Sequence, residues 1–146
     1  KTGVPGELAG IIDYGESHCM GSITENSPLG IRGVLNDTAG ELEGEVYEVA
    51  YKQDIEPGKA YIISEVSGER AEYEIEIESL DYSGDEENKG ILFKVTDERL
   101  LDLTGGIVQG MSGSPIIQNG KMIGAVTHVF VSDASMGYGI FIEKML

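Results

Sequence analysis

A serine framed by glycines and followed by two apolar runs constrains this chain more than any other feature. Residues 105–117 read GGIVQGMSGSPII, and Ser112 lies between Gly110 and Gly113. Residues 116–129 then give an apolar run, an Asn-Gly pair and a second apolar run. An Asn-Gly pair between apolar runs is typical of two strands joined by a tight hairpin turn. The pattern therefore predicts a serine loop that leads directly into a β-hairpin.

The loop has the residue types that a nucleophilic serine needs. Small neighbours let the backbone turn tightly, and backbone amides can stabilise the negative charge that develops during acyl transfer. Ser112 is therefore the candidate nucleophile, and the amides of Gly110 and Ser112 form the candidate oxyanion hole. Glycine, serine and proline also dominate ordinary turns, so a plain turn between two strands is the alternative interpretation.

Short apolar runs alternating with turn signals continue through the rest of the chain. Strands are expected at residues 8–14, 19–24, 30–35, 44–50, 59–66, 71–80, 90–96, 114–118, 122–131 and 137–143. One short helical turn is expected at residues 96–101, where a threonine or aspartate can cap it. The 21 glycines suit an all-β barrel with many corners.

Charge excludes one class of partner. With 26 acidic and 10 basic residues among 146, the chain carries a net charge of −16. Such a surface repels phosphate backbones, so we expect no nucleic-acid partner. In the acidic run at residues 72–78, glutamates alternate with Tyr73, Ile75 and Ile77, which is the pattern of a strand with one solvated face. A chain of this length suits one domain with a real core, or two small barrels.

Cys19 is the only cysteine, so the chain has no intramolecular disulfide and no Cys-x-x-Cys pair. We expect no metal and no cofactor. Cys19 and its neighbour His18 raise the alternative of a cysteine nucleophile with a histidine base, but adjacent residues in a strand point to opposite faces. The serine loop is the better candidate.

Three segments carry a resemblance to a known family: Gly-Met-Ser-Gly-Ser-Pro at 110–115, Asn-Gly-Lys at 119–121 and Gly-Ala-Val-Thr-His-Val-Phe-Val at 124–131. Together they resemble the SpoIVB peptidases, the stage IV sporulation protein B family. The similarity extends from about Ser22 to Leu146 and is least diagnostic at residues 36–89. It implies an all-β, chymotrypsin-like double β-barrel serine protease with the first barrel incomplete. Residues 1–35 would be the end of that first barrel, and residues 36–146 the second barrel, which carries the nucleophile loop.

The resemblance also implies roles for other residues. Asp97 matches the acidic position of the family, although it lies closer to Ser112 in the chain than an acid on the first barrel should. The alternative is that Asp97 caps the short helix. The family's general base belongs to a Gly-His motif, and this sequence has none, so the base is expected upstream of Lys1. His18 lacks the family's context, and His128 suits the wall of the pocket better than the role of base.

The substrate pocket is expected around three segments, one just before the serine and two after it. Its walls would be residues 106–110, beginning with Gly106, and Thr127, His128 and Val129, with Thr127 also bracing the triad. Tyr138, between Gly137 and Gly139, would close the base. Glycines at these positions are expected to leave room for a substrate side chain.

By the same resemblance, the complete protein would be a serine endopeptidase of sporulation signalling. It would cleave a membrane-associated regulatory protein, and itself, in the space between forespore and mother cell, outside the cytoplasmic membrane. Residues 1–7 contain no apolar run. The resemblance implies a membrane-anchoring segment and a PDZ domain upstream, as in the family. The alternative is a non-catalytic β-barrel that binds peptides or partners. The sequence leaves the oligomeric state and the cleavage motif open.

Overall fold

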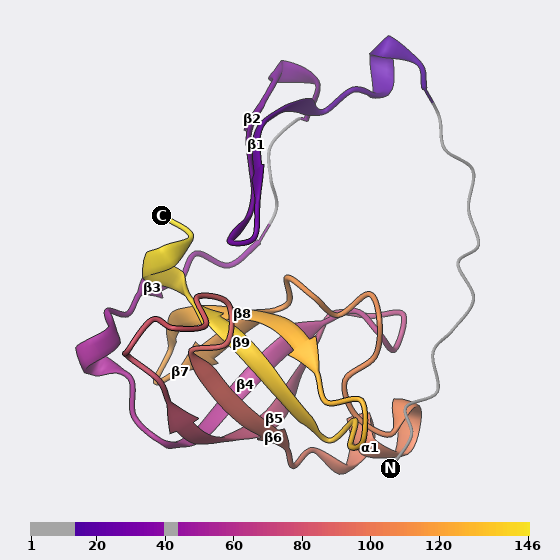
Figure 1. The fold of residues 1–146 in the computed structure, drawn as a ribbon. Coiled ribbons are helices and arrows are strands. Elements are labelled where there is room, and N and C mark those ends of the chain that lie inside the picture. The colour runs from indigo at the N-terminus through magenta and orange to yellow at the C-terminus, as the bar shows by residue number, and fades with distance from the viewer. Residues whose placement is uncertain (1–13, 40–43) are drawn as a thin grey trace. The chain divides into compact units, whose positions relative to one another are not determined.

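The computed structural model describes residues 14–39 and 44–146 (Figure 1). Contacts group them into two compact units, one within residues 6–46 and one over residues 47–146. The strand expected at residues 8–14 falls almost entirely outside the described residues. No helix in the described part of the chain is long and apolar enough to cross a membrane.

The first unit is built on a β-hairpin. β1 (Gly21–Ser27) pairs antiparallel with β2 (Gly30–Leu35), with a register shift between Ile23 and Glu25. Two short 3-10 helices, η1 (Glu16–His18) and η2 (Asp37–Ala39), flank it. The two strands expected in this region therefore exist. The assignment of residues 1–35 to a first barrel stays a prediction.

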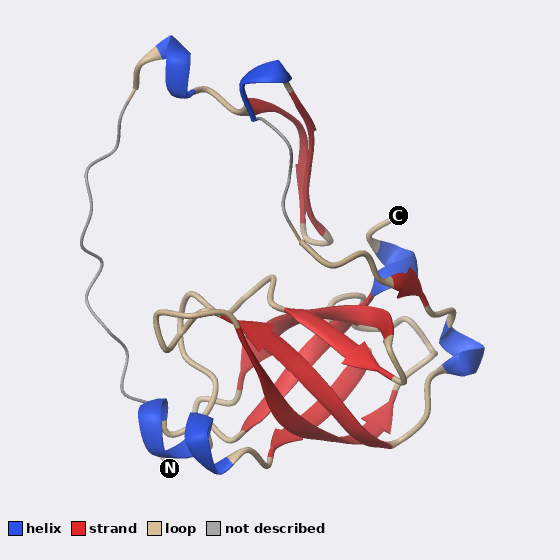
Figure 2. Ribbon diagram, turned by 180° about the vertical axis from the view of Figure 1, so that it is seen from behind, coloured by secondary structure: helices blue, strands red, loops and turns tan. Residues whose placement is uncertain are grey.

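The second unit contains a closed antiparallel barrel of six strands. The strands are β4 (Gly58–Ser64), β5 (Ala71–Leu80), β6 (Ile91–Val95), β7 (Pro115–Gln118), β8 (Lys121–Val129) and β9 (Met136–Phe141). Around the barrel the order is β8-β7-β4-β5-β6-β9, and pairing of β9 with β8 closes it (Figures 1 and 2). The all-β fold expected from the sequence is confirmed, since strands make up 44% of the structure and the described residues contain one α-helix.

Two expected elements differ in length from the prediction. The strand expected at residues 44–50 shrinks to β3 (Glu48–Val49), which lies parallel to the start of β8. The single helical turn extends to α1 (Glu98–Thr104), which ends on Gly105 in the left-handed conformation. The 3-10 helices η3 (Lys52–Asp54) and η4 (Ile142–Lys144) complete the unit.

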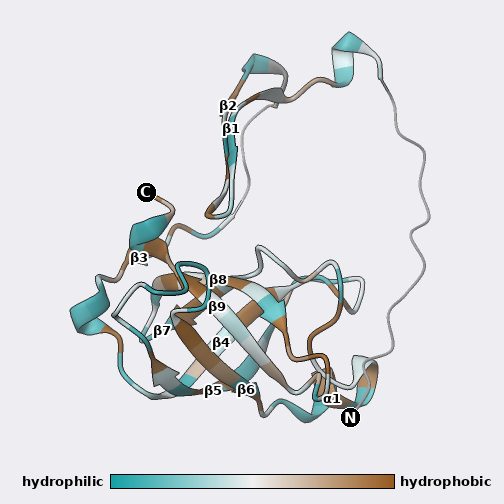
Figure 3. Cartoon of the chain, in the orientation of Figure 1, coloured by the Kyte–Doolittle hydropathy of each residue, from teal (hydrophilic) through white to brown (hydrophobic). Residues whose placement is uncertain are grey.

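The interior of the barrel follows the alternation in the sequence. Tyr73, Ile75 and Ile77 on β5 are at most 2% exposed, while the glutamates between them are exposed or half-buried. The core continues with aliphatic and aromatic residues from every barrel strand and from α1, among them Ile62, Ile91, Phe93, Leu100, Ile116, Ile123, Val126 and Phe141. Figure 3 shows hydrophobic colour on the barrel strands and a hydrophilic loop between β5 and β6.

The hairpin of β7 and β8 is turned by Asn119 and Gly120. Both residues have positive φ angles, 51° and 75°, as a two-residue turn matched to strand twist requires. The turn pairs Gln118 with Lys121. The opposite end of β7 receives the serine loop, so this hairpin determines where Ser112 lies.

Candidate active site

The nucleophile loop, residues 105–114, connects α1 to β7 and is anchored in the core. Ile107 and Met111 are 4% and 2% exposed and belong to the hydrophobic core. The Ile107 amide donates to the Ala134 carbonyl at 2.7 Å. Ser112 itself is exposed. Burial of its apolar neighbours therefore fixes the loop while the serine remains accessible.

Ser112 lies against the end of β8. The Gly113 amide donates to the Val126 carbonyl at 2.8 Å, and the Val126 amide donates to the Ser114 carbonyl at 2.9 Å. The Ser112 hydroxyl donates to the Thr127 carbonyl at 3.1 Å. The pairing of β7 with β8 ends at Pro115 and Ala125, so the last residues of β8 extend beyond β7. This overhang of β8, residues 126–129, lies beside the serine.

The two amides of the predicted oxyanion hole are free to bind an acceptor. Among the described residues, neither the Gly110 amide nor the Ser112 amide donates a hydrogen bond. Gly110 and Gly113, on either side of the serine, have φ angles of 100° and 91°. Such angles suit glycine. Free amides two residues apart in a tight turn are the donors that an oxyanion requires.

Asp97 is the N-cap of α1. Its carboxylate accepts from the Arg99 amide at 2.9 Å and from the Glu74 amide at 3.1 Å, and it forms an ion pair of 2.7 Å with the Arg99 guanidinium. The hydrogen bond from Arg99 lowers the pKa of Asp97 to about 2. These contacts bind the helix to β5, as the capping alternative requires. A catalytic role for Asp97 stays a prediction.

Thr127 joins three segments around the serine. Its carbonyl accepts from Ser112, and its hydroxyl lies 2.6 Å from the Asn88 carbonyl and 3.1 Å from the Tyr138 carbonyl. The hydroxyl thus holds the loop before β6 against β8 and β9. The next residue, His128, is exposed, and Val129 is half-buried against the core.

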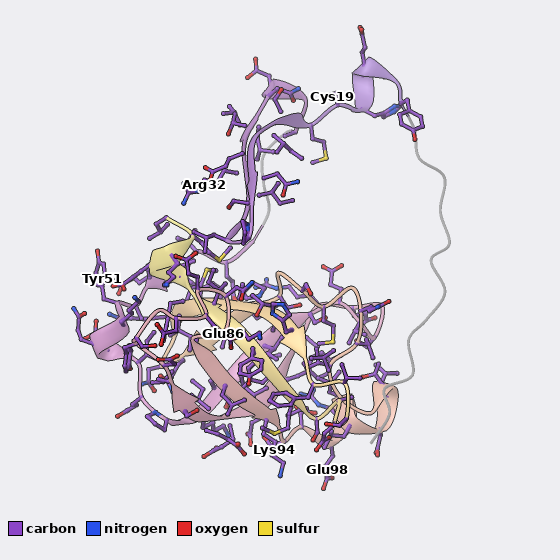
Figure 4. All side chains as sticks on the ribbon, viewed as in Figure 1. Cys19, Arg32, Tyr51, Glu86, Lys94 and Glu98 are labelled. Carbon is purple, nitrogen blue, oxygen red and sulfur yellow. The ribbon has the colours of Figure 1, made fainter. Side chains whose placement is uncertain are left out.

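Tyr138, on β9, forms an aromatic pair with Phe130, which follows β8. Its ring stacks on Phe130 with centroids 4.9 Å apart, and Lys89 Nζ lies 5.5 Å from the Tyr138 ring centroid. Lys89 also forms a 2.9 Å ion pair with Glu86, which Figure 4 labels. Sequence reasoning missed Asn88 and Lys89, because the β5–β6 loop reaches this site only through the closure of the barrel. It also missed the role of Phe130, which follows β8 and meets Tyr138 only because β8 pairs with β9.

Gly137 and Gly139 on β9 are expected from the sequence to leave space for a substrate side chain, and this expectation is wrong. A Cβ atom on Gly137 would lie 2.6 Å from the Phe93 ring, and one on Gly139 would lie 2.6 Å from Ile116 Cδ1. Gly106 is buried and packs directly on the Ala134 carbonyl. The barrel's own residues occupy this space. Contact of Gly106 with a substrate stays a prediction.

A hollow of about 290 Å³ lies beside the nucleophile loop, next to the end of β4 and not next to β8. Its lining comes from the end of β4 and from the loop: Ser64, Glu65, Val66, Gln109, Gly110 and Met111. The two segments meet because β4 pairs with β7, with Ile62 opposite Ile116. No local sequence signal announces a pairing between segments so distant in the chain.

The described residues offer no metal centre, since they contain no group of three or more His, Cys, Asp or Glu side chains that could hold a metal ion. Cys19, the candidate for the alternative nucleophile, lies in the first unit and is exposed. Its thiol donates to the Gly21 carbonyl at 3.4 Å. Ser112 therefore stays the candidate nucleophile of the second unit.

The closed barrel and the serine loop that enters it define a chymotrypsin-like fold of the barrel-containing serine protease class. The chain belongs to the SpoIVB peptidase S55 family, whose model matches residues 1–146. The resemblance noted in the sequence is thereby confirmed.

Among solved structures, the chain is similar to Rv3671c from M. tuberculosis H37Rv, crystallised as a serine-to-alanine mutant in an inactive form. The two share 13% sequence identity with a TM-score of 0.53, over 86% of this chain and 60% of that chain. At this identity the likeness concerns the fold alone, and the chain spans 60% of that protein's crystallised length. Comparison with curated protein sequences gives no significant match.

Proposed function

We propose that this chain provides the nucleophile barrel of a serine endopeptidase. The observation that carries the proposal is an exposed Ser112 with the unpaired amides of Gly110 and Ser112 beside it. Membership of a peptidase family supports it independently. Ser112 would attack a peptide carbonyl, the two amides would bind the oxyanion, and water would then release the acyl-enzyme.

The nucleophile needs a base that the Thr127 carbonyl cannot replace. A serine hydroxyl is a weak nucleophile until a neighbouring group accepts its proton, and a backbone carbonyl does not take up that proton. Catalysis therefore requires a general base, which we propose is a histidine, to accept the proton of the Ser112 hydroxyl and to return it to the leaving amine. By resemblance to the family, this histidine belongs to a Gly-His motif, which this sequence does not contain.

The overhang of β8 suits the acyl part of a peptide substrate. Val126 already bonds to the serine loop through its amide and carbonyl. Thr127, His128 and Val129 extend beyond it, and His128 and Val129 pair with β9 on their other side. A strand edge of this kind can add an extended peptide through main-chain hydrogen bonds. Thr127, His128 and Val129 would contact the acyl part, with Tyr138 close behind Thr127.

Family membership supports a proposal for the biological setting. A peptidase of this family has a protein substrate, and we propose a membrane-associated regulatory protein of sporulation signalling. The reaction would take place outside the cytoplasmic membrane, between forespore and mother cell. Cleavage of the protein by itself is part of the same proposal.

One observation favours a second candidate function, a non-catalytic barrel that binds peptides or partners. The Ser112 hydroxyl donates to a carbonyl and not to an imidazole. A barrel that keeps the β8 overhang without a base would still bind an extended peptide.

Labelling with a fluorophosphonate probe separates the two functions. The probe is applied to the full-length protein and to two alanine variants, Ser112→Ala and Ser132→Ala, since Ser132 is an exposed serine outside the nucleophile loop. Labelling that disappears only in Ser112→Ala supports the endopeptidase. Equal labelling of all three proteins, or none, contradicts it and favours the binding barrel.

A further inference from the structure

The hollow beside Gly110 is separate from the β8 overhang. In the barrel, β7 lies between β8 and β4, and the nucleophile loop leads into β7. The Ser112 hydroxyl faces Thr127 on the β8 side, whereas Ser64, Glu65 and Val66 of the hollow come from the end of β4. A peptide whose acyl part lies along β8 and whose scissile carbonyl is at the Gly110 and Ser112 amides therefore continues over the hollow with its leaving-group part.

The size of the hollow suits one side chain. Its volume of about 290 Å³ is at the lower end of the range for small-molecule sites, roughly 300–1,000 Å³. Met111 contributes an almost fully buried side chain to the lining, and Val66 is half-buried. These apolar groups can cover the methylene stem of a long side chain, while its polar end stays near the rim.

Glu65 gives the hollow its charge. It is exposed, and no described residue forms an ion pair with it. It is the one charged residue of the lining, because the others are polar, apolar or glycine. Glu69 and Arg70 lie on the same β4–β5 turn but do not line the hollow, and Arg70 has a partner of its own.

We infer that this hollow binds a lysine or arginine side chain of the substrate on the leaving-group side of the scissile bond, with Glu65 as its ionic partner. The apolar floor holds the stem, and the carboxylate at the rim meets the cation. This inference rests on the proposed endopeptidase function.

Peptide binding by the 146-residue chain tests the inference without requiring turnover. Two octapeptides of otherwise uncharged residues, one with a single lysine and one with glutamate at the same position, are titrated into ¹⁵N-labelled protein. We expect amide shifts at Glu65, Val66 and Gly110 with the lysine peptide, and binding about fivefold tighter than for the glutamate peptide, as for an exposed ion pair.

Two variants identify the group responsible. Glu65→Gln should abolish the preference for lysine, whereas Glu69→Gln, which changes the net charge equally, should retain it. Equal binding of both peptides, a preference that survives Glu65→Gln, or a loss that is equal in both variants overturns the inference. Serine labelling reports separately on the endopeptidase: labelling of Ser112 without a lysine preference contradicts this inference alone, and a preference without labelling contradicts the endopeptidase.

Discussion

The hydroxyl of Ser112 donates a 3.1 Å hydrogen bond to the backbone carbonyl of Thr127. The serine proton is therefore held by a group that cannot take it up, so this hydrogen bond is not that of an activated serine. The same Thr127 has its hydroxyl against Asn88 and Tyr138. The position of the serine thus depends on the closed barrel as well as on its own loop.

Replacing Ser112 by alanine should abolish function without unfolding the protein. An exposed hydroxyl with one hydrogen bond contributes about 1 kcal/mol or less to the free energy of unfolding. We expect Ser112→Ala to lose fluorophosphonate labelling and cleavage, with a urea midpoint close to that of the unchanged protein. Retained cleavage would assign the chemistry to another residue.

Gly106 should be far less tolerant of a side chain than Gly110. A Cβ on Gly106 would overlap the Ala134 carbonyl, whereas nothing lies within 4 Å of a Cβ on Gly110. Both have positive φ, so Gly110→Ala should cost about 1 kcal/mol through backbone strain. Gly106→Ala should cost about 3 kcal/mol or more. Urea unfolding of both variants measures the difference, and equal costs would show that the contact with Ala134 is easily relaxed.

Met111 couples the nucleophile loop to the core. It is 2% exposed, and truncation of a buried methionine to alanine typically costs about 2–5 kcal/mol. We expect Met111→Ala to lower the free energy of unfolding by that amount and to increase hydrogen exchange at the Gly113 amide, which donates to the Val126 carbonyl. The neighbouring exposed residue gives the control, since Gln109→Ala should change stability by less than about 0.5 kcal/mol. A stable Met111→Ala variant would mean that the loop holds its shape without this anchor.

Asp97 should stabilise the fold in a pH-dependent manner. Its pKa is lowered to about 2, mainly by Arg99, so its contribution is complete above its ordinary pKa, near 4, and is lost as the pH falls toward 2. At pH 7, Asp97→Ala should lower the free energy of unfolding by about 1–2 kcal/mol, as expected for loss of an N-cap.

The difference between Asp97→Ala and the unchanged protein should shrink between pH 4 and pH 2. Asp102→Ala, at an exposed position on α1, provides the control. A difference that is constant across this range would show that the carboxylate charge does not matter. Serine labelling of folded Asp97→Ala reports on the predicted acid role, because a pure cap leaves the labelling rate unchanged.

Much of the fold could be predicted from local patterns. The alternation on β5 and the Asn119–Gly120 turn identify a strand and a hairpin from neighbouring residues alone, and both are present. The parallel pairing of β3 with β8 and the closure of β8 on β9 could not be predicted. They depend on contacts between distant segments, for which a single sequence carries no periodic signal.

The site divides in the same manner. Ser112 and the two amides belong to one short loop, so the sequence could identify them. From the sequence, the glycines of β9 are expected to leave space for a substrate, but Gly137 instead accommodates the Phe93 ring from the neighbouring strand β6. The hollow with Glu65 depends on the pairing of β4 with β7. Whether a glycine faces the core, or a glutamate lines a surface hollow, depends on the strands that lie next to it in the folded barrel.

Closure of the barrel by β8 and β9 has a consequence for synthesis of the protein. The bonds that hold the serine loop come from Val126 and Thr127 on β8, and β8 is completed by β9, which ends at Phe141. Synthesis of Ser112 alone therefore does not supply the strands that hold its loop. Until β8 and β9 have been made, up to Phe141, the serine loop of a nascent chain lacks its hydrogen bonds with Val126 and Thr127.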